Sequence, residues 1–303
     1  MIKGRARFYL DVYTSILGLP ESGFNFSNGW FEGFKQRYKL VYVKMNGEKC
    51  SADTSAVPEF IEKFRRIIED GGYQLHQVYN VDETGAIWKQ TATSTFVPEL
   101  LAKTKQVSTV KSPKSQVTLL LGGNATGDHK LKPFLVNKYQ NPAGLKGDAI
   151  KESLSFYFRQ QSNAWMDTYL FEDWLLNCFL PEVEAHQKKL DPSATVKALL
   201  LVDNAKVHLT RLPDVLPKPK EGGVHLQIEF LSPNTTSLIQ PMDQTVIRTF
   251  KSKYINLMMD KVVRQEDVNS FLANLTLKDA IPMMDEAWQS VQASTMKSPG
   301  INS

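Results

Sequence analysis

Cysteine is scarce in this 303-residue sequence, and its two cysteines, Cys50 and Cys178, lie far apart. Neither belongs to a CxxC pair or a Cys/His cluster, so we expect neither a disulfide framework nor a structural zinc site, and a reducing compartment fits best. Long hydrophobic runs are also missing, since none approaches the roughly 20 residues that span a bilayer. The N-terminal MIKGRARFYLDVYTS has no apolar stretch followed by a cleavage site. We therefore expect neither secretion nor membrane insertion.

A large excess of charge is absent as well, because 36 lysines and arginines face 32 acidic residues, for a net charge of +4. The positive charges are nevertheless clustered. WFEGFKQRYKL near the start is one cluster, and LAKTKQVSTVKSPKSQ, with four lysines and no acid, is the second. Neither is long enough to be a disordered polybasic tail. Both can contact phosphates, in the second cluster through Lys103, Lys105, Lys111 and Lys114.

The first 75 residues are predicted to be helical with a linker. In FSNGWFEGFKQRYKL, Ser27 or Asn28 can cap a helix on which Trp30, Phe31, Phe34 and Tyr38 recur at helical spacing. This helix is either an amphipathic helix with a solvated basic face or a recognition helix. The polar MNGEKCSADTSA follows as a linker, so we place a boundary near residue 50. Pro58 then opens a helix that Gly71 and Gly72 close.

Five strands are predicted after this point. YQLHQVYNVDETG alternates like a strand and is expected to break at a turn containing Gly85, which leaves Asp82 at its end. The lysine-rich stretch 103–114 is expected to be a loop. QVTLLLGGNATGDHKLKPFLVN is typical of a hairpin, and LLLVD and HLQIEFL supply the fourth and fifth strands.

Two long helices complete the predicted order. In residues 163–190, an apolar stripe is expected to belong to the core, with a break at Pro181; it comprises Trp165, Tyr169, Trp174, Leu175 and Phe179. DQTVIRTFKSKYINLMMDKVV forms the last helix. Three strands joined as antiparallel neighbours and then helix-linked strands indicate an α/β fold with a mixed sheet covered by helices. The ribonuclease-H-like fold has this order.

Three aspartates are expected where these elements end or begin. Asp82 ends the first strand, Asp203 ends the fourth in LLLVDNAKVH, and Asp243 lies just inside a helix in QPMDQTVIRTF. If the first and fourth strands are neighbours, Asp82 and Asp203 lie side by side, and the last helix can bring Asp243 over them. Converging carboxylates repel one another, and a divalent cation relieves this repulsion. Oxygen ligands suit Mg²⁺ or Mn²⁺, and two such ions about 4 Å apart serve phosphodiester chemistry.

Each aspartate also has an ordinary structural interpretation. Asp82 can be a turn residue, Asp203 an N-cap, and Asp243 a residue favoured by the helix dipole after Pro241. The joint placement of the three favours the metal site over these separate interpretations.

Three sequence blocks resemble a known family. VYNVDETGAIWK, LLLVDNAKVH and FLSPNTTSLIQPMDQTVIRTFK are similar to the signature blocks of the Tigger/pogo transposase superfamily, in the branch with jerky, jerky-like proteins and centromere protein B. SQVTLLLGGNATGDHKLKPFLV and DEAWQSV also resemble family segments. The likeness extends from about residue 25 to about residue 293.

The resemblance implies a DDE-type nuclease of ribonuclease-H-like fold over residues 76–293, with Asp82, Asp203 and Asp243 as catalytic and metal-binding residues for two Mg²⁺ or Mn²⁺ ions. It implies that residues 1–48 are part of a centromere-protein-B-type helix-turn-helix, with 49–75 as linker and helix and 294–303 as a short tail. Lys35, Arg37 and Lys39 would contact DNA phosphates, with Trp30 and Phe34 as a small core. The family also implies a nuclear protein and leaves a homodimer open.

Three functions follow from these observations as hypotheses. The first is a metal-dependent DNA endonuclease and strand transferase, which the complete triad of aspartates favours. The second is a domesticated or decayed DNA-binding protein that no longer cuts. The family carries a further helix-turn-helix that these residues do not include, which favours the second. The third, a phosphotransferase with Asp82 as nucleophile, is disfavoured because VDETG lacks an aspartate two residues after Asp82.

Overall fold

The computed structural model describes residues 10, 14–18, 23–38, 56–89, 116–205, 223–231, 240, 242–262, 265 and 268–296, with backbone alone at 56, 57, 243, 244, 268 and 269. The chain forms two units, Met1–Cys50 and Ser51–Ser303. Within the described ranges, every helix is too short or too polar to cross a bilayer.

The N-terminal unit contains helix α2 (Asn28–Arg37). Its N-cap is Ser27, whose hydroxyl accepts a hydrogen bond from the Trp30 backbone N–H at 3.1 Å. Trp30 packs between Phe26 and Phe34, with ring centroids 4.9 and 5.3 Å away. The predicted N-cap is therefore confirmed. These aromatic rings form a continuous row. No described side chain of α2 is fully buried.

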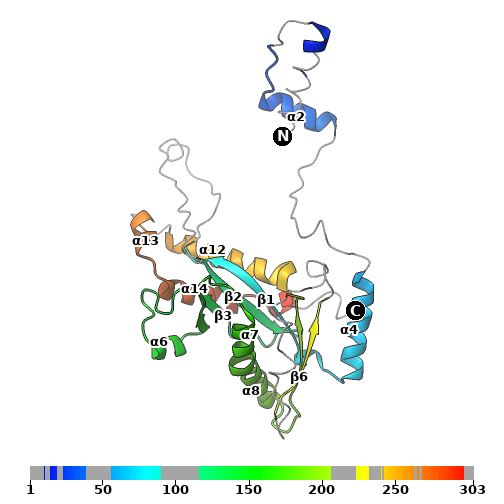
Figure 1. The fold of residues 1–303 in the computed structure, drawn as a ribbon, viewed down its shortest axis with the longest axis vertical. Coiled ribbons are helices and arrows are strands. Elements are labelled where there is room, and N and C mark those ends of the chain that lie inside the picture. Colours follow the sequence, from blue (N-terminus) through cyan, green and yellow to red (C-terminus); the bar gives the residue numbers. More distant parts are fainter. Residues whose placement is uncertain are drawn as a thin grey trace. The chain divides into compact units, whose positions relative to one another are not determined.

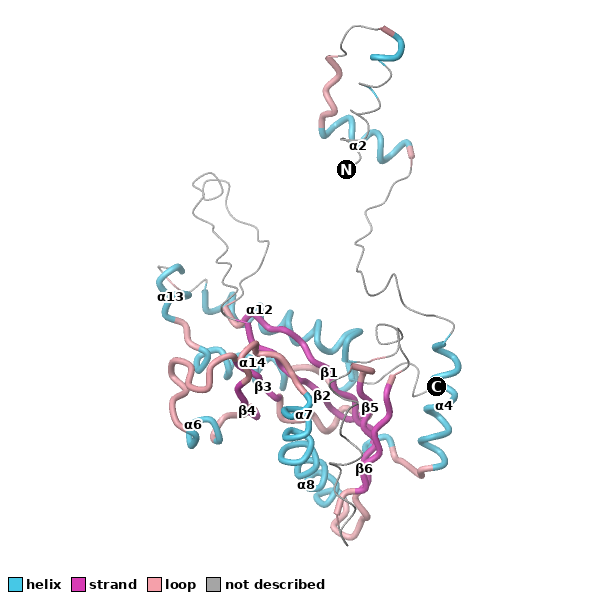
Figure 2. Tube along the Cα trace, viewed as in Figure 1, coloured by secondary structure: helices cyan, strands magenta, loops and turns pink. Residues whose placement is uncertain are grey.

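The larger unit is built on one mixed six-stranded sheet of order β4-β3-β2-β1-β5-β6 (Figures 1 and 2). Strand β1 is antiparallel to β2, and β2 to β3, whereas β1, β5 and β6 run parallel to one another. This arrangement confirms the predicted ribonuclease-H-like sheet and the pairing of the first and fourth predicted strands. The strands are β1 (Val78–Ile87), β2 (Gln116–Asn124), β3 (Phe134–Asn137), β4 (Tyr157–Gln160), β5 (Lys197–Val202) and β6 (His225–Phe230).

Helices cover both faces of this sheet. One face packs against α7, η3 and α8, and the other against η4, α12 and α14, with α4 over the part of that second face near β5 (Figure 1). The helices are α4 (Ala56–Asp70), η1 (Leu75–Gln77), α6 (Asp148–Glu152), α7 (Thr168–Trp174), η3 (Leu175–Phe179), α8 (Leu180–Leu190), η4 (Met242–Val246), α12 (Ile247–Val262), α13 (Val268–Asn274), α14 (Leu277–Gln289) and α15 (Ala293–Met296).

Side-chain alternation along β1 assigns its residues to the two faces. Val78 packs with Leu199 and Leu201 on the α4 side, whereas Tyr79 and Val81 belong to the core beneath α7 and α8. Because successive side chains of a strand point to opposite faces, Asn80 and Asp82 share the face of Val78. This is the face that η4 and α12 cover.

The predicted helices are largely confirmed. Helix α4 ends before Gly71, and Gly72 adopts a φ of 59°, the left-handed conformation that glycine provides after a helix. The helix expected over 163–190 begins at Thr168 and contains a π-helical stretch, η3, that ends at Phe179, two residues before Pro181. Pro181 therefore lies in the first turn of α8, where its missing N–H is tolerated.

Two expectations about packing and strand ends are wrong. Trp165 and Tyr169 are 68% and 72% exposed and do not belong to the core, because Trp165 precedes α7 and Tyr169 points away from the sheet on its first turn. Strand β1 does not break at Gly85 but runs to Ile87, since β2 pairs with it up to Gln116. Strand β4, which was not predicted, pairs with β3 at the sheet edge.

Candidate metal-binding nuclease site

Asp82 lies within β1 rather than at its end, because the strand continues to Ile87. Its position relative to Asp203 follows from the register. Asn80 on β1 pairs with Leu201 on β5, and Asp82 and Asp203 each come two residues later along parallel neighbours. Asp82 is thus two residues past the last paired residue of β1, and Asp203, two residues past that of β5, directly follows the strand; neighbouring strands are about 5 Å apart. The pairing of β1 with β5 ends just before this level, so both aspartates stand where the two strands part.

Both carboxylates accept a hydrogen bond from nearby backbone. Asp82 Oδ1 accepts from the Glu83 N–H at 2.9 Å, and Asp203 Oδ1 accepts from the Ala205 N–H at 3.3 Å. The second bond closes a turn of the type that aspartate favours after a strand. Both residues are half-buried. Their backbones are thus held by the sheet and the turn, while the aspartates retain solvent access.

The backbone of Asp243 lies in η4, and the structure does not describe its side chain. The backbone of the segment is nonetheless fixed against β1. The Met242 N–H donates to Asn80 Oδ1 at 3.2 Å, and Gln240 Nε2 donates to the Val81 carbonyl at 3.1 Å. The segment that carries Asp243 is therefore bonded to the residues that directly precede Asp82.

These residues fit a divalent metal ion by the chemistry of their donors. Carboxylate oxygens are the ligands that Mg²⁺ and Mn²⁺ prefer. Asp82 lies on β1, Asp203 directly follows the neighbouring strand β5, and the third aspartate comes from a segment bonded to β1. Among the side chains that the structure describes, no group of three His, Cys, Asp or Glu residues forms a metal site, and Asp243 is outside that set.

Asn80 and Gln240 were not singled out from the sequence. Both are buried polar residues, 7% and 0% exposed. The sequence indicates one of them through the asparagine in VYNVD, a polar residue between apolar residues of a strand. Such a residue requires hydrogen-bond partners when buried, but the sequence does not identify them.

The predicted phosphate contacts are only partly within the described residues. On α2, Lys35 pairs with Glu32 at 2.8 Å, and Arg37 Nε donates to the Gly33 carbonyl at 3.4 Å. Both residues lie in the last turn of the helix. Lys39 and the lysines of the second cluster lie outside the described residues, namely Lys103, Lys105, Lys111 and Lys114.

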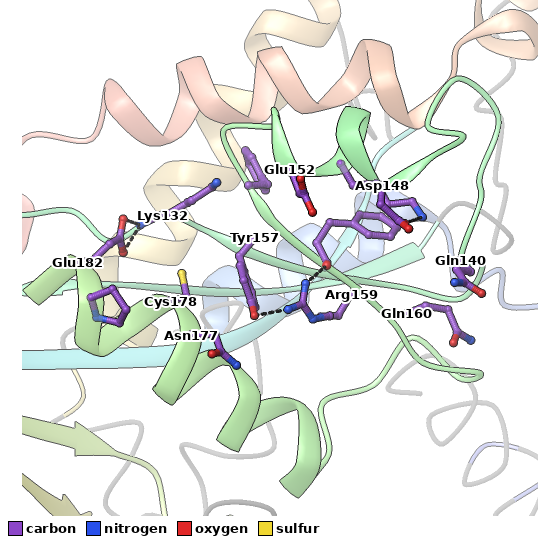
Figure 3. A pocket seen from close by; sticks show the side chains of 14 residues that line it. Lys132, Gln140, Asp148, Glu152, Tyr157, Arg159, Gln160, Asn177, Cys178 and Glu182 are labelled. Atoms are coloured by element: carbon purple, nitrogen blue, oxygen red, sulfur yellow. Dashed lines mark hydrogen bonds and ion pairs between the residues drawn. The ribbon is translucent and has the colours of Figure 1, made fainter. Parts of the chain in front are cut away.

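A separate cleft of about 630 Å³ lies between β4, α6 and α8 (Figure 3). Its arginine is already engaged, since Arg159 Nε pairs with Asp173 at 2.7 Å and the guanidinium lies 4.2 Å from the Tyr157 ring centroid. Burial raises the pKa of the Cys178 thiol to about 12, so the thiol stays protonated and is a poor nucleophile. The cleft contains none of the predicted site residues.

Two known protein families match this chain. The family of DDE superfamily endonucleases matches residues 114–299, which is more than half of the chain. The Tc5 transposase DNA-binding domain, a helix-turn-helix family, matches residues 1–44. The first match includes Asp203 and Asp243, and the second includes Lys35, Arg37 and Lys39.

Several curated proteins are similar over most of the chain. The human Jerky protein homolog is 33% identical over 234 residues, covering 76% of this chain and 39% of the relative. The mouse Jerky protein is 30% identical over 272 residues, covering 90% and 45%. The human Tigger transposable element-derived protein 7 is 30% identical over 237 residues, covering 76% and 41%. The chain thus spans less than half the length of each of these relatives.

Solved structures of Mos1 transposase are similar to this chain. The crystal structure of the Mos1 strand transfer complex matches with a TM-score of 0.45 and 12% identity, covering 95% of this chain and 68% of that one.

Proposed function

The chain belongs to the family of DDE superfamily endonucleases, and we propose that it binds DNA and cleaves its phosphodiester bonds with the help of divalent metal ions. One observation carries the proposal: Asp82 lies on β1, Asp203 directly follows the neighbouring parallel strand β5, and the segment of Asp243 is hydrogen-bonded to β1. The match to transposase-derived relatives supports DNA as the substrate.

Asp82, Asp203 and Asp243 are the residues that would hold the metal. When bound, Mg²⁺ or Mn²⁺ would lower the pKa of an attacking water or 3′-hydroxyl and stabilise the leaving oxygen. The protein contributes rigid placement of the ligands. Asp82 is fixed by strand pairing on β2, and the Asp203 carboxylate is held by the turn to Ala205. Ligands on rigid elements keep their positions while substrate binds, which lowers the cost of ordering them.

The N-terminal unit is proposed to hold the DNA, with Lys35, Arg37 and Lys39 contacting phosphates. Its match to a transposase DNA-binding domain and the two basic residues in the last turn of α2 support this assignment. We accordingly assign residues 1–48 to DNA binding, 49–75 to a linker and helix, 76–293 to the nuclease and 294–303 to a tail. The lysines of 103–114 would add phosphate contacts, and a DNA-binding protein of this family would act in the nucleus.

The test is cleavage of supercoiled plasmid in Mg²⁺ or Mn²⁺, with DNA retention measured in parallel. Asp203→Asn keeps the oxygen that accepts from Ala205 but removes the charge, and is expected to abolish nicking while DNA retention persists. Asp191→Asn is the matched control, because Asp191 Oδ1 accepts from the Ser193 N–H at 2.8 Å in the same type of turn. The control should cleave like the wild type.

A catalytically silent DNA-binding protein is the other outcome of this test. Retention of DNA without metal-dependent nicking by the wild type would contradict the nuclease and leave DNA binding as the function. Nicking that persists in Asp203→Asn would contradict the assignment of the site.

A further inference from the structure

Three segments that are far apart in the sequence must be held together for the proposed site to exist. Strand pairing joins β1 to β5 only over Val78–Asn80 and Leu199–Leu201. It therefore stops before the level of Asp82 and Asp203. The η4 segment belongs to no strand of the sheet. Other bonds must fix the relative positions of the three aspartate-bearing segments at this point.

The Asn80 side chain contacts both of the other segments. Its Nδ2 donates to the Leu201 carbonyl at 3.1 Å, and its Oδ1 accepts from the Met242 N–H at 3.2 Å. Leu201 lies two residues before Asp203, Met242 directly precedes Asp243, and Asn80 itself lies two residues before Asp82. A single carboxamide therefore bridges the backbones of all three segments within two residues of each aspartate.

Gln240 adds a second link between two of the segments. Its side chain is fully buried and donates from Nε2 to the Val81 carbonyl at 3.1 Å. Val81 directly precedes Asp82. The start of η4 is thus bonded to β1 at two successive residues, once through its own backbone N–H and once through this glutamine.

We propose that Asn80 is a positioning residue for the aspartates, an inference that rests on the proposed nuclease function. An alanine side chain in its place would leave the Leu201 carbonyl and the Met242 N–H without these partners. Buried backbone groups without partners are costly, so the segments would shift to find others. The metal ligands would then lose their common placement, although none of them had been changed.

Asn80→Ala is the first variant, and Asn80→Ser, whose hydroxyl is too short to reach both partners, is a milder one. Asn124→Ala is the matched control. Asn124 is 1% exposed and equally well bonded, since its Oδ1 accepts from the Gly127 and His129 N–H groups. Those bonds hold the turn between β2 and β3 instead of the aspartate segments. The control variant should therefore lose stability without any change at the site.

The experiment measures two quantities on the full chain without DNA. Amide hydrogen exchange reports the order of the backbone around Asp203 and Met242, and calorimetric titration with Mn²⁺ reports metal affinity. For Asn80→Ala we expect exchange at Met242 to accelerate at least about tenfold and the Kd for Mn²⁺ to rise about tenfold. Asn80→Ser should show smaller changes in the same direction, and Asn124→Ala should show neither change.

The two measurements separate the possible failures. Unchanged exchange at Met242 and Asp203 in both Asn80 variants would overturn the positioning role. Faster exchange with an unchanged Kd for Mn²⁺ would overturn it as well, because the segments would then loosen without affecting the ligands. Absence of Mn²⁺ binding to the wild type would contradict the proposed function, and the exchange data would still decide whether Asn80 holds the segments.

Discussion

Strand β1 contributes polar side chains to both faces of the sheet, and these side chains have different kinds of partner on the two faces. On the η4 face, Asn80 bridges distant backbones and Asp82 lies half-buried two residues further on. On the α8 face, the buried Tyr79 hydroxyl forms a hydrogen bond with His129 Nδ1 at 2.9 Å. The His129 ring stacks on that of His186, with centroids 4.0 Å apart.

The two faces also differ in their ionisable groups, which are histidines near α8 and aspartates near η4. Burial, together with the neighbouring His186, lowers the pKa of His129 to about 4, although Asp128 opposes this shift. Burial also lowers the pKa of His186, assisted by His76 and Lys189. Burial on the α8 face therefore favours the neutral form of these imidazoles, whereas Asp82 stands on the η4 face. We expect protons to act on stability through the α8 face and metal ions to act through the η4 face.

The largest expected effect comes from a cavity in the core of the η4 face. Trp288 is fully buried against Phe250, and its Nε1 donates to the Leu131 carbonyl at 3.1 Å. Trp288→Ala should lower the free energy of unfolding by about 3–5 kcal/mol in urea denaturation followed by circular dichroism.

Trp165→Ala is the control for this prediction. Because Trp165 is mostly exposed, its removal should change stability by less than about 0.5 kcal/mol. Equal effects of the two substitutions would contradict the packing described for this face.

An intermediate effect is expected from pH. The ordinary pKa of histidine is 6.5 and that of folded His129 is about 4, so between these values the unfolded chain binds the proton and the folded chain does not. Stability contributed by the neutral ring is present above pH 6.5 and is lost as the pH falls toward 4. With allowance for partial exposure, the loss is on the order of 1–2 kcal/mol.

His129→Gln should reduce this loss, measured as the difference in unfolding free energy between pH 7 and pH 4.5. His225→Gln is the control, because His225 is exposed at the start of β6. A pH dependence that His225→Gln reduces as much as His129→Gln would place the response outside the α8 face.

The smallest effect concerns the N-terminal unit, outside the sheet. Replacing both Lys35 and Arg37 with Gln should weaken DNA binding and reduce the slope of log Kd against log salt by about 1–2, because each phosphate contact contributes about 0.9. Lys189→Gln on α8 should leave the slope unchanged. An unchanged slope in the double variant would show that α2 does not contact phosphates.

The sheet and its helices could be predicted because apolar periodicity and turn residues determine them. Strand β4 was missed since YFRQ is only four residues long, too short for a periodicity to show. The end of β1 was misplaced because Gly85 predicts a turn, whereas pairing with β2 keeps it in the strand. Trp165 and Tyr169 continue the apolar spacing of the core helix. Trp165, however, precedes α7, which begins at Thr168, and Tyr169 is exposed on the first turn of α7. The spacing therefore does not decide their burial.

The candidate site was predictable only in part. The neighbouring positions of β1 and β5 could be predicted from the order of the elements, whereas Asp82, Asp203 and Asp243 as metal ligands stay a prediction. Asn80 and Gln240 could not be predicted, because their partners, Leu201, Met242 and Val81, are backbone groups whose positions depend on the finished fold. No residue type in the sequence identifies such a contact.

The most direct test of the central claim is the anomalous scattering of Mn²⁺ soaked into crystals of the protein. We expect a peak within coordination distance of the Asp82 and Asp203 carboxylates, with Asp243 as a further ligand, and we expect its loss in Asp203→Asn. A fully occupied Mn²⁺ peak at other residues, with none between Asp82 and Asp203, would contradict a metal-dependent nuclease site at these aspartates.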